Sequence, residues 1–246
     1  MKRKSCQHLR LLIAALVILS AAICAVAQTR ATKQNTREKT DAPAPAQSSS
    51  TGEQKPVDTL YVYEFKQPDF LVSRIRIEHN AEGRGRISFQ RKGFDNPFEE
   101  ELELSEAAYA RIKALWDALR FLDSNDDYQA EKQFPHLGTV RLEMKQAGRD
   151  RSAEFNWTTD ANAKALANEY WRAADQAILV FDISVSRENL PLEAPKLMDK
   201  LDQLLSRGGL SDPKQLIPLL RELSTDERVP LIARNHAGRI LKKIEK

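Results

Sequence analysis

The alternation of apolar and polar residues that begins at Leu60 constrains the fold of this chain most strongly. Residues two apart in a β-strand lie on the same face of the sheet, so a short alternating run predicts a strand with one buried face. Four such runs follow one another, at residues 60–65, 74–78, 86–90 and 101–104. The first is apolar at almost every position, which indicates a strand buried on both faces.

The spacing of apolar residues then changes from two to the 3.6 of an α-helix. Ser105 is a good N-cap, and the helix that it opens is predicted to run from about residue 105 to about residue 122. Its apolar stripe consists of Ile112, Leu115, Trp116, Leu119 and Leu122. We expect this helix to cover one face of the sheet.

The same cycle recurs in the next 60 or so residues. Alternating runs at 140–145 and 153–157 flank a turn at Gly148, and Asp160 caps a second, long helix. The stripe of that helix is Leu166, Tyr170, Ala173, Ala177 and Phe181. The order ββββαββα predicts an α+β domain at residues 58–189, with an antiparallel sheet of about six strands and two covering helices.

A short internal echo links the two predicted hairpins. The segment 76–86 aligns without gaps on 141–151, and five of the eleven positions are identical. A duplication predicts two equivalent hairpins with Gly83 and Gly148 at their turns, where a residue without Cβ adopts positive φ at little cost. The alternative is chance similarity between charged hairpins, and the differing apolar phase after the turn would require a bulge in a strict repeat.

The chain becomes helical after Ile183, and residues 190–246 are predicted to form an all-α region that packs on the α+β domain. Gly208 and Gly209 separate its first helix from the next, which Ser211 or Asp212 opens together with Pro213. Residues 213–244 resemble a single HEAT-type helical hairpin. A solenoid repeat normally needs neighbours to bury its faces, so a lone copy is expected to pack on the preceding domain.

The layout of residues 58–182 also resembles that of exported bacterial domains of unknown function. The resemblance rests on Leu104-Ser105 at the start of the first helix, on Phe121 and Tyr128 after it, and on the glycine-turned hairpin that follows. It implies a fold and carries no activity.

Residues 1–27 are typical of a secretory signal peptide. A basic start and an apolar core precede the small residues of Ala25-Val26-Ala27, after which cleavage would leave Gln28 first. An uncleaved membrane anchor is the alternative, and a lipoprotein at Cys24 is disfavoured by the bulky Ile23 before it. Residues 28–57 lack large apolar side chains and are predicted to be a disordered linker.

The predicted signal also changes the meaning of the composition. The net charge of the chain is +3, but four of its 38 Lys and Arg and none of its 35 Asp and Glu lie in residues 1–27, so 34 against 35 leaves −1. Clustered excess positive charge is what binds nucleic acid, and the mature chain lacks it. Both cysteines, Cys6 and Cys24, leave with the signal. Disulfides, thiol nucleophiles and cysteine metal sites are then excluded.

The acidic run at residues 123–127, with Glu131 beyond it, is the best cation candidate. Asp123, Asn125 and Asp127 alternate as in a calcium loop, but the Gly and Glu that an EF-hand needs further along are absent. A polar loop whose Asp and Asn side chains bind local amides is the favoured interpretation.

Other isolated motifs favour structural roles. The histidines outside the signal, His79, His136 and His236, lack metal spacing. Ser211-x-x-Lys214 matches an acyl-transfer motif, but its companion motifs are absent and Ser211 suits a helix cap. Asn156-Trp157-Thr158 is a glycosylation sequon in a predicted strand.

The outward side chains of the predicted strands favour a solvated face of cross-strand ion pairs, with binding of an acidic partner or a cell-wall polymer as the alternative. They are Arg74, Arg76, Arg86, Arg141 and Lys145, with Glu78, Glu143 and Glu154 among them.

Our leading hypothesis is a secreted or periplasmic, non-enzymatic binding or scaffolding module whose partner is a protein or another envelope component. No catalytic, cofactor-binding or metal-ligating residue is assigned. The alternatives are an envelope hydrolase whose site combines His136 with Asp123, Asp126 or Asp127, and a membrane-tethered extracytoplasmic domain. The ligand and the oligomeric state stay open.

Overall fold

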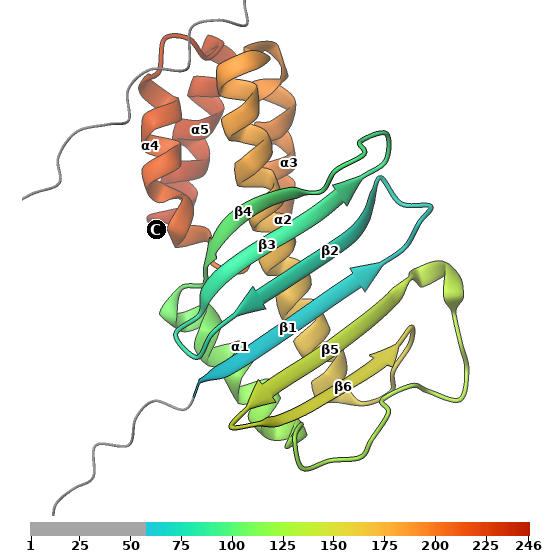
Figure 1. Cartoon of the computed structure of the whole chain (residues 1–246). Coiled ribbons are helices and arrows are strands. Elements are labelled where there is room, and N and C mark those ends of the chain that lie inside the picture. The colour runs from blue at the N-terminus through green and yellow to red at the C-terminus, as the bar shows by residue number, and fades with distance from the viewer. Residues whose placement is uncertain (1–57) are drawn as a thin grey trace, which may run out of the picture. The chain divides into compact units, whose positions relative to one another are not determined.

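A computed structural model describes residues 58–246 of the chain (Figure 1). The predicted signal peptide and linker, residues 1–57, lie outside the described part. The order ββββαββα is confirmed, with short 3₁₀ turns (η) added. The elements are β1 (Thr59–Lys66), β2 (Val72–His79), β3 (Arg84–Arg91), β4 (Phe98–Glu103), α1 (Glu106–Leu119), η1 (Pro135–Leu137), β5 (Thr139–Gln146), β6 (Arg149–Phe155), α2 (Ala161–Asn189), η2 (Pro191–Glu193), α3 (Ala194–Ser206), η3 (Pro213–Leu216), α4 (Ile217–Thr225) and α5 (Leu231–Ile244).

The six strands form one antiparallel sheet, as predicted, and their order in it is β4-β3-β2-β1-β5-β6. β1 to β4 follow one another as hairpins, and α1 then carries the chain back so that β5 pairs with the free side of β1. Tyr63 of β1 therefore lies between Ile77 of β2 and Leu142 of β5. This central position explains why β1 is apolar on both faces.

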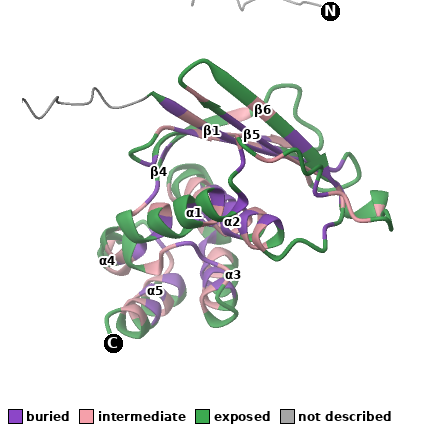
Figure 2. Cartoon of the chain, turned by 90° about the horizontal axis from the view of Figure 1, so that it is seen from below, coloured by how far each residue is buried: buried purple, intermediate pink, exposed green. Residues whose placement is uncertain are grey.

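Helices α1 and α2 cover one face of the sheet and leave the other open (Figure 2). The core between them is aromatic and aliphatic, and Ile77, Ile112, Leu142 and Leu166 are completely buried in it. This arrangement confirms the predicted α+β architecture.

The first helix ends earlier than predicted. α1 stops at Leu119 because Arg120 takes the left-handed conformation, with φ 45° and ψ 44°, and its N–H bonds to Asp117 O. Leu122 therefore lies beyond the helix and not on its stripe. The N-cap is as predicted, since the Ser105 side chain accepts a hydrogen bond from Ala108 N.

Both glycines of the sequence echo lie at hairpin tips with positive φ, 77° at Gly83 and 78° at Gly148. The two hairpins differ after the turn. In a strict repeat Glu143 would lie opposite Arg151, but it lies opposite Ser152, so the registers differ by one residue. The equivalence therefore holds for the positive φ of the two glycines and is lost in the returning strand.

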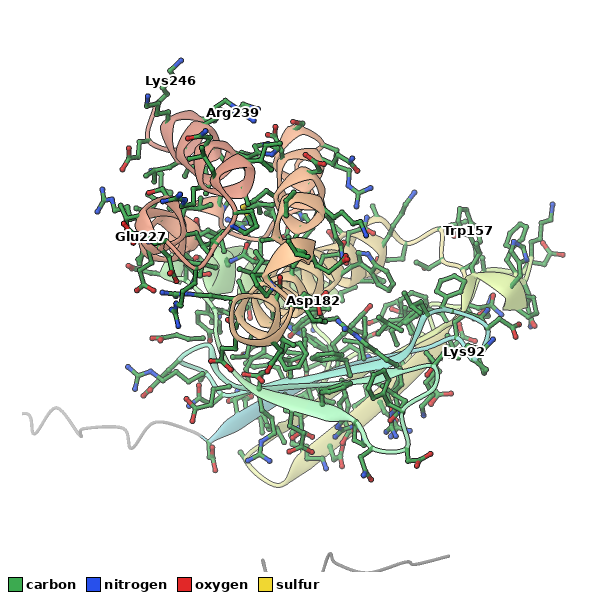
Figure 3. All side chains as sticks on the ribbon, turned by 90° about the horizontal axis from the view of Figure 1, so that it is seen from above. Lys92, Trp157, Asp182, Glu227, Arg239 and Lys246 are labelled. Carbon is green, nitrogen blue, oxygen red and sulfur yellow. The ribbon has the colours of Figure 1, made fainter. Side chains whose placement is uncertain are left out.

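The long helix α2 is shared by two cores. Its first half faces the sheet, whereas Leu179 and Ile183 are buried against the helices that follow, with Met198 and Leu220. Arg187 of α2 also pairs with Asp226 at 2.6 Å. In Figure 3 the label of Asp182 marks α2, which passes between the sheet and the C-terminal helices. The C-terminal helical region is thus built onto the side of α2.

A buried hydrogen-bond chain joins the sheet to both covering helices. Tyr170 of α2 accepts from Trp116 Nε1 of α1 at 2.9 Å, and its hydroxyl lies 2.8 Å from His79 Nε2 of β2. His79 Nδ1 lies 2.9 Å from Asn80 O, which only accepts, so Nδ1 carries the proton and Nε2 accepts from Tyr170. His79 is 1% exposed, and this burial lowers its pKa to about 4. The imidazole is neutral in the folded protein.

The pKa of His79 predicts a pH-dependent stability. The unfolded chain binds a proton near the ordinary histidine pKa of 6.5, but the folded chain does so only near 4. Burial of the neutral His79 therefore contributes its full share of the free energy of unfolding above pH 6.5. This share is lost as the pH falls from 6.5 toward 4, by about 3 kcal/mol in total. Urea unfolding of the wild type and of His79→Gln at pH 7 and pH 4 measures this difference.

The variant His136→Gln is the matched control, because His136 is exposed. It should keep the pH dependence of the wild type, whereas His79→Gln should lose about 3 kcal/mol of it. Equal pH dependence in the wild type and His79→Gln would show that His79 is not the buried neutral group described here.

Candidate binding groove along strand β4

The acidic run at residues 123–127 forms a polar loop. Asp123 accepts a hydrogen bond from Arg149 Nη2 at 2.6 Å, and this bond holds the pKa of Asp123 below its ordinary value. Asp127 accepts from the backbone N–H of Gln129. Within residues 58–246, no three Asp, Glu, His or Cys side chains are placed to hold a metal ion.

His136 and the aspartates of this loop are not brought together. His136 is exposed in η1, where its ring centroid lies 6.0 Å from that of Phe134. In the described part of the chain, no hydrogen bond or ion pair joins His136 to Asp123, Asp126 or Asp127. The hydrolase site that we considered from the sequence has no geometry to support it here.

His236 does meet carboxylates from another element, in a hollow of about 490 Å³ between α3 and α5. Its Nδ1 lies 3.2 Å from Asp199, and its Nε2 lies 3.3 Å from Asp202. Lys243 also bonds to Asp202, and these contacts keep the pKa of Asp202 low despite partial desolvation. Both ring nitrogens of His236 are thus engaged by carboxylates of α3, and these contacts tie α5 to α3.

The open face of the sheet is covered by paired charges. Glu64 bonds to Arg74 at 2.5 Å, and Glu143 bonds to Lys145 at 2.9 Å. Partial burial raises the pKa of Glu143, but the bonds from Lys145 and Arg141 outweigh it and hold this pKa below its ordinary value. On β1, β2 and β5 these charges therefore satisfy one another, both along a strand and, as for Glu64 and Arg74, across strands.

The sequon side chains are also engaged in local structure. Asn156 Oδ1 accepts a hydrogen bond from Phe134 N at 3.0 Å. Thr158 is buried, and its hydroxyl accepts from Asp160 N. Both side chains help to hold the chain after β6 against the preceding loop.

The two outer strands of the sheet, β4 and β6, differ in the segments that lie beside them (Figure 1). Residues 120–134 lie beside β6 and bond to it at a side chain and just beyond the end of the strand. Arg151 bonds to Phe121 O at 2.5 Å, and Ala130 N donates to Trp157 O at 2.9 Å. That end of the edge is protected from pairing with other strands.

The edge at β4 is exposed and acidic. Four of the six residues of β4 are exposed glutamates: Glu99, Glu100, Glu101 and Glu103. The cations nearest to them, Arg84 and Arg86 of β3, lie 4.0 Å from Glu103 and Glu99. These contacts are long and solvent-exposed, so they hold the carboxylates only weakly.

A groove of about 430 Å³ runs between β4 and helix α2. Its floor is apolar, and Leu102, Leu104, Ala177, Val180 and Phe181 contribute to it. The exposed carboxylates of Glu100, Glu101, Glu103 and Glu188 line its rim. A concave apolar surface with a few polar groups of one charge is typical of a binding site.

One end of the groove is polar and holds a hydroxyl without a hydrogen bond. Gln176 of α2 bonds to Gln215 of η3 at 3.1 Å, and Gln215 donates to Glu103 O of β4 at 3.0 Å. Ser211 beside them is 8% exposed, yet its Oγ has no partner among the described residues. The helix cap that we expected from Ser211 or Asp212 comes from Asp212, which accepts from Lys214 N. Ser211 Oγ is therefore a buried hydroxyl without a hydrogen bond at this end of the groove.

The sequence did not reveal this groove. From the sequence, the glutamates of β4 are the polar positions of a predicted strand. Ser211 is a candidate helix cap and part of a Ser-x-x-Lys match. The groove residues come from β4, α2 and η3, which are far apart in the sequence. The one sequence signal for the groove is the run of glutamates on β4, the last of four consecutive predicted strands.

Comparison of the sequence with models of known protein families and with curated proteins gives no match. Among the helices of residues 58–246, none combines the length and the apolar character that crossing a bilayer requires.

The unpartnered hydroxyl of Ser211 predicts an unusual effect on stability. A buried polar group without a hydrogen bond costs about 1–3 kcal/mol, so Ser211→Ala should leave the free energy of unfolding unchanged or raise it within that range. Urea unfolding of the purified protein measures the change.

Ser105→Ala is the contrasting variant, because the Ser105 hydroxyl caps α1 by accepting from Ala108 N. Its loss should lower the free energy of unfolding by about 1 kcal/mol. If Ser211→Ala destabilised the protein as much as Ser105→Ala, Ser211 would have a structural partner after all.

Proposed function

We propose that this chain is an exported, non-enzymatic binding module that takes a basic segment of another polypeptide into the β4 groove. The observation that carries the proposal is the combination of an exposed acidic sheet edge with an apolar groove beside it. The hydrolase alternative lacks such support, because His136 and His236 do not form an available general base.

Charge favours a cationic ligand. Four exposed carboxylates line the groove, those of Glu188 and of Glu100, Glu101 and Glu103 of β4. Arg84 and Arg86 approach the glutamates of β4 only at 4.0 Å. Lysine or arginine side chains of a partner would complement the excess negative charge. Such complementarity mainly speeds association and selects against acidic partners.

The apolar floor favours a polypeptide over a simple cation. A free polyamine would leave Val180 and Phe181 in contact with water, whereas apolar side chains that alternate with basic ones would cover them. The ligand that fits both features is a segment with basic and apolar residues in alternation.

Export is the second part of the proposal, and the signal pattern of residues 1–27 supports it. Residues 58–246 contain no cysteine, so the folded part needs no particular redox environment. The cleaved form and the membrane-tethered form differ only in whether residues 1–27 remain attached.

Binding is tested with a fluorescein-labelled nonapeptide of alternating lysine and valine. Fluorescence anisotropy should show that the protein binds this probe. The triple variant Glu99→Gln, Glu101→Gln, Glu103→Gln should raise its Kd about tenfold, because each exposed ion pair contributes about 0.2–1 kcal/mol.

The matched control is Glu154→Gln together with Asp150→Asn, which removes exposed acidic groups from β6, on the other edge. The control should bind the probe with unchanged Kd. Equal weakening in both variants would mean that net charge, and not the β4 edge, attracts the peptide.

Export is tested by expressing the full chain in a bacterium and sequencing the N-terminus of the protein recovered from the envelope or the medium. We expect the mature protein to begin at Gln28. Full-length protein that stays soluble inside the cell with its first residues intact would contradict the proposed export.

A further inference from the structure

We infer that the bound segment pairs with β4 as a seventh strand of the sheet, with basic side chains over the open face and apolar side chains in the groove. The inference rests on the proposed function and specifies how the ligand binds. It follows from the backbone of β4, from the alternation of its side chains and from the contrast between the two edges.

The backbone of β4 has free hydrogen-bonding groups on its outer side. Leu104 N donates to Gly83 O, so the backbone groups of Leu104 and of alternate residues before it point toward β3. Those of Glu99, Glu101 and Glu103 consequently point away from the sheet. Within residues 58–246, Gln215 Nε2 donates a hydrogen bond to one of these outer groups, Glu103 O.

Gln215 also defines where an added strand would end. Because its side chain occupies the carbonyl of Glu103, a partner strand can pair with Glu99 and Glu101 but meets Gln215 at the next outward position. The unpartnered Ser211 Oγ lies in the groove at this same end.

Side chains along β4 alternate between the two faces. Glu99, Glu101 and Glu103 lie on the open face, in register with Ser88, Arg86 and Arg84 of β3. Glu100 and Leu102 lie on the helix side, at the groove.

An added strand continues this alternation. Residues with lysine or arginine would lie beside the open-face glutamates, and the residues between them would place apolar side chains on the groove floor. Recognition by an edge strand works in this way, with main-chain bonds for affinity and pockets for alternate side chains.

A second copy of this chain is a poor occupant. Two β4 edges would bring like charges together, since each carries four glutamates. At the opposite edge, residues 129 and 130 bond to the backbone just beyond β6, so a β4–β6 contact that extended to this end would require them to leave. A separate, basic segment avoids both obstacles.

Backbone methylation of the nonapeptide probe tests the inference. In an added strand, alternate N–H groups face β4 and the others face solvent. N-methylation of the set that faces β4 removes its hydrogen bonds and should raise the Kd at least tenfold, whereas methylation of the other set should change it less than threefold. For a strand antiparallel to β4, like every pairing in this sheet, the sensitive set is the lysines.

The outcomes separate this inference from the function on which it rests. Weaker binding only of the probe with methylated lysines supports an added strand antiparallel to β4. Weaker binding only of the probe with methylated valines supports a parallel one. Equal weakening by both sets overturns strand addition while leaving binding in the groove intact. If the unmethylated probe does not bind, the proposed function fails and the strand-addition inference fails with it.

Discussion

Helix α2 has to bury two faces at once, and the rest of the structure depends on this requirement. Toward the sheet it presents Leu166 and Tyr170, and toward the C-terminal helices it presents Leu179 and Ile183. A rigid helix that belongs to both cores fixes the C-terminal region relative to the sheet. As a consequence η3 lies beside the end of β4, and the groove is bounded by α2 and η3 as well as by the edge strand.

Hydrogen bonds and ion pairs that cross between elements reinforce this arrangement without disulfides. Arg111 of α1 pairs with the buried Glu169 of α2 at 3.3 Å and donates to Ser211 O at 2.6 Å. Buried polar groups of this kind specify one arrangement, because any other leaves them unsatisfied. One such contact therefore holds the chain segment that carries the free hydroxyl of Ser211.

Periodicity predicted the fold because it reports which face of each element is buried. It could not predict the end of α1, where Arg120 adopts a left-handed conformation that usually favours glycine or asparagine. It also left the hairpin register open, since a one-residue shift alters pairing without altering composition. The groove was beyond reach for a different reason: its residues converge only after α2 has placed η3 beside β4.

The two edges of the sheet together argue that β4 is more than a protected edge. Charge alone discourages aggregation, and an edge that served only this purpose would not need an apolar floor beside it. Beside β6 the chain places residues 120–134, which bond to the Arg151 side chain and to the backbone of Asn156 at the end of the strand. At β4 the chain instead leaves backbone groups open next to an apolar surface and a buried hydroxyl without a partner. An edge built in this way is costly for the free protein and suited to a strand that supplies the missing contacts.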